Sequence, residues 1–250
     1  MKIILSPAKK MIEDPDILSY TQLPEYLEQA EEILRWLQCR TYEELKKLWK
    51  CNDSIAQQNF KRLENMELRK RLTPAVLSYE GIAYQYMAPS VFEERQLAYI
   101  QKHLRILSGF YGVLKPMDGV RSYRLEMQAK AGMRGHKNLY GLWGDSLYKS
   151  VRDKDGVIIN LASKEYSKCI EKYLTLQDTY ITCVFGEWVN GRIVQKGTYA
   201  KMARGEMVRF MAEREISKPE EIKKFNRLNY NFQKELSSDR EYLFIREIME

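Results

Sequence analysis

The chain has 250 residues, of which 44% are hydrophobic and 12% aromatic, a composition typical of globular proteins that excludes an intrinsically disordered chain. No apolar run approaches the roughly 18 residues that a membrane-spanning helix needs, so we expect no membrane partner. The net charge of +7, from 41 Lys and Arg against 34 Asp and Glu, is too moderate to identify a partner by itself.

The first predicted element is a short buried strand at residues 3–5, which ends before Pro7 and is too short for the apolar core of a signal peptide. From about residue 20 to residue 107 the sequence is mainly helical. Apolar residues recur at spacings of three and four over residues 23–37, and Thr41 with Glu44 forms a capping-box pattern before a second helix. Further helices are predicted to begin at Asn52, at Thr73-Pro74 and at residue 92.

Two glycines three residues apart, Gly109 and Gly112, follow the helix predicted over residues 92–107. Glycines at this spacing permit a tight turn with positive φ, and a hairpin whose amides point outward can hold a phosphate backbone. An ordinary connection from a helix to a strand is the alternative interpretation.

Strand-like segments then dominate, at residues 122–127, 156–162 and 180–188, with a hairpin signal at Asn190-Gly191 and a returning strand over residues 192–196. A helix beginning at Thr198 and a final strand over residues 241–246 complete the pattern. We therefore predict the α+β class, as a single compact domain over residues 1–250 with a largely helical N-terminal part at 20–107 and a β-sheet core.

Polar side chains of several kinds are candidates for one cleft. Lys201 and Arg204 lie three residues apart on one face of the predicted helix, where they can bind a phosphate or form a solvated basic surface. Further candidates follow the predicted strands or lie in the loops between them: Ser6, Lys9, Glu126, Asp145, Asn160 and Ser163. Ser163 and Asp145 can equally be helix caps, whereas carboxylates beside Lys9 would resemble a general acid/base group.

No metal site is predicted, because the four cysteines form no CxxC pair and lie far in sequence from the two histidines. We expect no cofactor, and scattered thiols without a secretion signal favour a cytoplasmic location.

Six segments in this order resemble the YaaA family of peroxide stress proteins: SPAK at 6–9, HLRILSGFYGVLKPMD at 103–118, YRLEM at 123–127, LYGLWGD at 139–145, INLASKEY at 159–166 and YAKMARGEMVRF at 199–210. The resemblance implies a bacterial cytosolic protein that protects against hydrogen peroxide and is associated with low free iron and reduced DNA damage. It also implies a positively charged cleft, a helix-hairpin-helix element and binding of duplex or branched DNA without sequence specificity.

Transferred to this sequence, the helix-hairpin-helix element corresponds to residues 107–114, with Gly109 and Gly112. The cleft residues are Lys9, Arg124, Lys201 and Arg204. Two hypotheses remain beside DNA binding. One is an enzyme acting on a nucleotide, base or other phosphorylated small molecule in the same cleft, with no catalytic residue assigned; the other is an iron-binding buffer. The sequence leaves the oligomeric state open.

Overall fold

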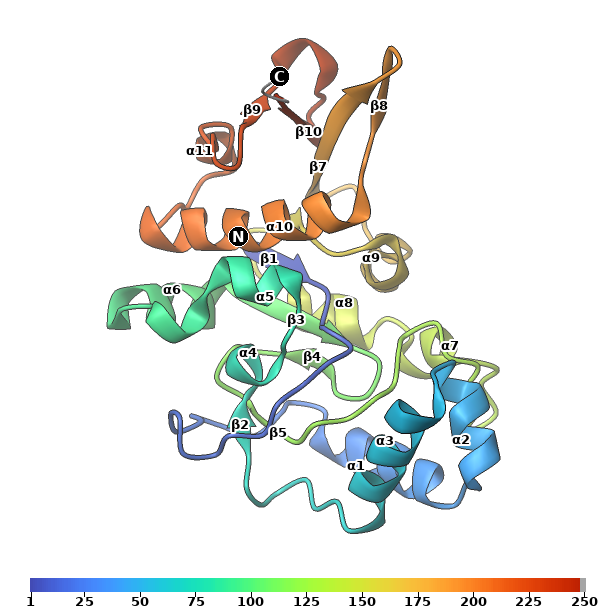
Figure 1. The fold of residues 1–250 in the computed structure, drawn as a ribbon. Helices are drawn as coiled ribbons and strands as arrows, with labels where there is room; N and C mark the ends of the chain where they lie inside the picture. Colours follow the sequence, from blue (N-terminus) through green and yellow to red (C-terminus); the bar gives the residue numbers. More distant parts are fainter. Residues whose placement is uncertain (248–250) are drawn as a thin grey trace.

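A mixed sheet forms the centre of the computed structural model, which describes residues 1–247. Within these residues the sheet has eight strands, of which seven follow the order β4-β3-β1-β6-β7-β10-β9, and the eighth, β8, pairs with β7 outside this path (Figure 1). The strands are β1 (Lys2–Leu5), β3 (Leu104–Ser108), β4 (Gly112–Leu114), β6 (Val157–Asn160), β7 (Thr179–Val189), β8 (Arg192–Val194), β9 (Tyr230–Phe232) and β10 (Glu241–Arg246). This mixed architecture confirms the predicted class.

The strand β1 lies in the middle of the parallel part of the sheet. It pairs with β3 on one side and with β6 on the other, both in parallel, and β6, β7 and β10 continue the parallel order. Ile3 and Ile4 are fully buried, as expected for a strand covered on both faces. The parallel order brings the carboxyl ends of β1 and β6 to the same edge of the sheet.

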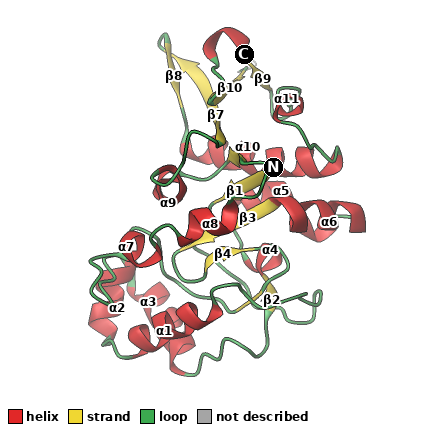
Figure 2. Ribbon diagram, turned by 180° about the vertical axis from the view of Figure 1, so that it is seen from behind, coloured by secondary structure: helices red, strands yellow, loops and turns green. Residues whose placement is uncertain are grey.

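The N-terminal part is helical, as predicted, and α1 to α3 gather at the end of the molecule away from the β7–β8 hairpin (Figures 1 and 2). Its helices are α1 (Leu27–Gln38), α2 (Tyr42–Trp49), α3 (Asp53–Glu64), α4 (Ala75–Ser78), α5 (Ile82–Met87), the 3-10 helix η1 (Pro89–Val91) and α6 (Glu94–His103). The capping box of Thr41 and Glu44 and the Asn52 cap are both present. A helix follows Thr73-Pro74 as predicted, but it begins at Ala75 with Pro74 as its N-cap, because Thr73-Pro74 itself forms the short strand β2, paired with β5 (Gly119–Val120).

The second half contains the shorter helices α7 (Leu139–Trp143), α8 (Ser146–Val151), α9 (Lys164–Glu171) and α11 (Pro219–Ile222), the 3-10 helix η2 (Lys234–Leu236) and the long helix α10 (Gly197–Glu213). Gly205 allows α10 to pack directly on α5, because a Cβ at this position would lie 1.8 Å from the carbonyl oxygen of Ala83. None of the helices described in residues 1–247 is long and apolar enough to cross a bilayer.

The segment around Gly109 and Gly112 is a buried β-hairpin between β3 and β4, so the helix-hairpin-helix prediction for residues 107–114 was wrong. The preceding helix ends at His103, because Leu104–Ser108 is a fully buried strand. The amides of Phe110 and Tyr111 both donate to Ser108 Oγ, and both side chains are fully buried. These two amides of the turn are therefore not available to a phosphate.

Three other predictions concern the second half. Asn190 and Gly191 have φ values of 51° and 74°, which confirms the tight hairpin, and the final strand has the predicted bounds. Residues 122–127 were wrongly predicted as a strand, since they form an irregular segment. Helix α10 begins at Gly197 with Lys196 at its N-cap, so Thr198 lies inside the helix.

Candidate functional site

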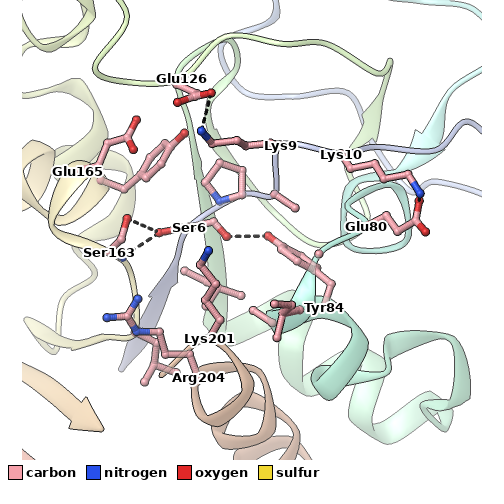
Figure 3. Close-up of a pocket in the computed structure, with 18 of the residues that line it drawn as sticks. Ser6, Lys9, Lys10, Glu80, Tyr84, Glu126, Ser163, Glu165, Lys201 and Arg204 are labelled. Carbon is pink, nitrogen blue, oxygen red and sulfur yellow. Dashed lines mark hydrogen bonds and ion pairs between the residues drawn. The ribbon is translucent and has the colours of Figure 1, made fainter. Parts of the chain in front are cut away.

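A pocket of about 550 Å³ lies where the carboxyl ends of β1 and β6 meet α5, α9, α10 and the irregular segment over residues 123–126 (Figure 3). Its lining contains Ser6, Lys9, Lys10, Glu80, Tyr84, Tyr123, Arg124, Glu126, Ser163, Glu165, Tyr166, Lys201 and Arg204, together with apolar side chains. Sites at the carboxyl edge of parallel strands are common in α/β proteins, because the strands end there and loops supply side chains.

Two serines join the strands at the centre of the pocket. The amide of Ser163 donates to Ser6 Oγ at 2.8 Å, and Ser6 Oγ donates to Ser163 Oγ at 3.1 Å. The hydroxyl of Tyr84 donates to the Ser6 carbonyl oxygen at 3.0 Å, which attaches α5 to the same point. Ser163 occupies the N-cap position of α9 without capping it, so its hydroxyl belongs to the pocket.

An acidic group lies on one side of these serines. Glu126 Oε1 is 3.0 Å from Lys9 Nζ and 3.4 Å from an Nη atom of Arg124. Glu165 accepts a hydrogen bond from the Gln128 amide at 3.2 Å. Burial raises the pKa of Glu165 above its ordinary value, and the negative charge of Glu126 raises it further.

Two cations on α10 extend into the pocket from the opposite side, toward Ser6 and Ser163 (Figure 3). Lys201 is exposed, whereas the Nε atom of Arg204 is buried and has no hydrogen-bond partner among the residues that the structure describes. Burial lowers the pKa of Arg204 from its ordinary value. In the described part of the chain, no carboxylate forms an ion pair with either side chain. This side of the pocket can therefore receive an anion.

Buried tyrosines also line the pocket. Tyr84, Tyr123 and Tyr166 are each at most 6% exposed, and burial raises the pKa of all three, that of Tyr123 to about 12. Tyr123 is fixed by hydrogen bonds with Ser108 Oγ and Tyr79 Oη, at 2.6 and 2.8 Å. These phenols stay protonated at neutral pH and offer ring surface to a ligand.

Comparison with known proteins identifies the family. A family model described as peroxide stress protein YaaA matches residues 1–236. The chain belongs to the YaaA family. A UPF0246 protein of Agathobacter rectalis is 65% identical over 248 residues, which are 99% of this chain and 100% of the relative. UPF0246 proteins of Lachnoclostridium phytofermentans and Desulfitobacterium hafniense are 53% and 54% identical, over 98% and 100% of this chain and 96% and 100% of those relatives.

In this member of the YaaA family, seven of the predicted site residues line the pocket: Ser6, Lys9, Arg124, Glu126, Ser163, Lys201 and Arg204. The other four lie elsewhere. Gly109 and Gly112 belong to the buried hairpin, and Asp145 precedes α8 and pairs with Lys149 at 2.7 Å. The buried Asn160 accepts from the Ala162 amide and donates to Thr182 Oγ1, so it shapes the end of β6.

The site of this YaaA-family chain also contains polar residues outside the predicted set: Lys10, Glu80, Tyr84, Tyr123, Glu165 and Tyr166. Lys10 and Glu80 form an ion pair of 2.8 Å at the pocket. The only sequence signal nearby is Gly81, where a Cβ would lie 2.7 Å from that of Ala8, which brings the start of α5 against the end of β1. Among residues 1–247, no group of three or more His, Cys, Asp or Glu side chains is placed to hold a metal ion.

Proposed function

We propose that this chain binds duplex or branched DNA without sequence specificity, through phosphate contacts at the pocket, and thereby limits iron-dependent oxidative damage to DNA during peroxide stress. The observation that carries the proposal is the pair Lys201 and Arg204, which extend from one helix into the pocket without a carboxylate partner among residues 1–247. The family's description as peroxide stress proteins supports the cellular setting.

The two cations suit phosphate recognition in different ways. Lys201 is a mobile point charge, whereas the planar guanidinium of Arg204 can bind two phosphate oxygens together. Lys9 and Arg124 share the carboxylate of Glu126, so we expect each of them to contribute less. Contacts of this kind neutralise phosphates and require no base-reading helix, which accounts for binding without sequence specificity.

The salt dependence of duplex binding tests the proposal. About two to four phosphate contacts predict that log K falls with log salt at a slope of about −2 to −3.6. Lys201→Ala should weaken binding to all duplex sequences and reduce the slope by about 1. The matched control is Lys154→Ala, which removes the same charge from an exposed loop before β6, at the other edge of the sheet. Absent binding at low salt, or equal effects of the two variants, would contradict the proposal.

Protection of DNA is measured separately. Supercoiled plasmid is exposed to Fe(II) and hydrogen peroxide with the wild-type chain, Lys201→Ala or Lys154→Ala, and the nicked fraction is read on a gel. We expect the wild type and Lys154→Ala to lower nicking and Lys201→Ala to protect less, because fewer DNA molecules are occupied. An equal mass of albumin controls for radical scavenging. Equal protection by all variants would contradict the link between DNA binding and protection.

A further inference from the structure

The two sides of the pocket differ in charge, and DNA phosphates explain only one of them. Lys201 and Arg204 face the serine pair from one side, whereas Glu126 and Glu165 lie on the other (Figure 3). A phosphate beside either carboxylate would be repelled, so phosphate contacts alone leave the acidic side without a role. A ligand that fits the whole pocket carries an anion at one end and hydrogen-bond donors at the other.

The basic side has the donors that a single phosphate group needs. Arg204 Nε is buried and has no hydrogen-bond partner in the described residues 1–247, and Lys201 extends into the same space. Ser163 Oγ accepts the proton of Ser6, which leaves the proton of Ser163 free to be donated to a ligand oxygen. Together these groups would surround a terminal phosphate more completely than the rim contacts of a duplex backbone require.

The acidic side has the acceptors that a nucleobase edge needs. Glu165 faces the pocket with a carboxyl that is only partly occupied by one backbone amide. Glu126 is held in place by Lys9 and Arg124. Amino and ring N–H groups of a base can donate to these oxygens, as carboxylates recognise donor edges elsewhere. The ring surfaces of Tyr84 and Tyr166 lie in the same lining, and the volume is within the range of small-molecule sites.

We infer that the pocket binds a single nucleotide unit, with its phosphate against Lys201, Arg204 and Ser163 and its base toward Glu165 and Glu126. The inference rests on the proposed function in that it assigns the same pocket and the same cations. The nucleotide can be a free 5′-mononucleotide or one turned out of a DNA strand, because both present a phosphate and an exposed base edge.

Free nucleotides are tested by calorimetric titration of the full chain with AMP, GMP, CMP and UMP, and with ribose 5-phosphate as the ligand that lacks a base. At least one nucleotide with an amino-bearing base should bind about tenfold more tightly than ribose 5-phosphate. Lys201→Ala should weaken both kinds of ligand. Glu165→Gln should weaken the nucleotide by about tenfold and leave ribose 5-phosphate unchanged or tighter, and Glu126→Gln serves as a second variant of the same side.

The DNA arm compares a fully paired duplex with the same duplex carrying one unpaired nucleotide. Tighter binding of the bulged duplex, lost in Glu165→Gln, identifies DNA as the source of the nucleotide and supports the inference. The inference is overturned if neither free nucleotides nor bulged DNA bind better than their controls, or if Glu165→Gln changes nucleotide and ribose 5-phosphate binding equally. Paired-duplex binding without any such preference leaves the proposed function intact, whereas nucleotide binding without duplex binding overturns only the proposed function.

Discussion

The contact between α10 and α5 gives a sharp test of the packing that builds the pocket. An alanine Cβ at Gly205 would lie 1.8 Å from the Ala83 carbonyl oxygen, 2.7 Å from its carbon and 3.0 Å from its Cα. All three atoms are backbone, so no side chain can rotate away. Restoring an ordinary contact distance requires the two helices to separate by about 1.5 Å.

We expect Gly205→Ala to lower the free energy of unfolding by about 3 kcal/mol, at the upper end of the usual cost of overpacking. Alanine's higher helix propensity returns at most about 1 kcal/mol. For a chain of this size the melting temperature should fall by about 6–12 °C. Thermal and urea unfolding measure both quantities. Gly197→Ala is the matched control at the start of the same helix, where a Cβ meets no atom within 4 Å. A Gly205→Ala stability within about 1 kcal/mol of the wild type would refute this reasoning.

Three further predictions concern stability. Gly112 has φ +75° and a Cβ there would lie 2.9 Å from the Trp143 ring, so Gly112→Ala should lower the free energy of unfolding by about 2–4 kcal/mol. Gly191 has φ +74° but open space around it, so Gly191→Ala should lower that free energy by only about 1–2 kcal/mol in the same urea assay. Equal losses in the two variants would refute the clash with Trp143. Thr41→Ala removes a capping box and should lower the free energy of unfolding by about 1 kcal/mol. An unchanged midpoint of urea unfolding would show that the capping box does not stabilise the chain. Burial raises the pKa of Asp118 to about 7, whereas an unfolded Asp titrates near 3.9. The folded chain therefore holds a proton that the unfolded chain has lost, so stability should fall by a few kcal/mol as pH rises from about 4 to 7 and then level off. Urea unfolding measured from pH 4 to 7 should show a smaller change of stability with pH in Asp118→Asn than in the wild type. Parallel curves of stability against pH for the two proteins would contradict the assignment of this change to Asp118.

The elements that the sequence predicted well depend on interactions between near neighbours. The turn at Asn190-Gly191 requires only two residues with positive φ, and the Thr41–Glu44 capping box closes within three residues. Residues 104–108 were misread as helix because a strand buried on both faces lacks the alternation of polar and apolar residues. The adjoining glycines then suggested a functional hairpin, although Gly109 is required there by the backbone of residues 125–127.

Some residues of the candidate site could likewise be predicted from local sequence patterns, and others could not. The spacing of Lys201 and Arg204 predicted a shared helix face, and the strand ends placed Ser6 near Ser163. Tyr84 was missed because its bond to Ser6 spans 78 positions in sequence and depends on how α5 packs against α10. Asp145 was selected as a carboxylate that could share a cleft with Glu126 and Lys9, whereas the structure pairs it with Lys149 on the next helical turn.

The central position of β1 has a consequence for how the chain is made. Residues 2–5 leave the ribosome well before their partners, which are residues 104–106 and 158–160. At about 5–20 residues per second, roughly 8–30 s pass before the second of these partners is synthesised. During that interval the apolar strand β1 lacks its final neighbours. We therefore expect nascent chains stopped before β6 to be cleaved readily by protease near β1 and to bind chaperones. Chains that extend past α10 should resist cleavage near β1. Equal resistance at both lengths would contradict this order of assembly.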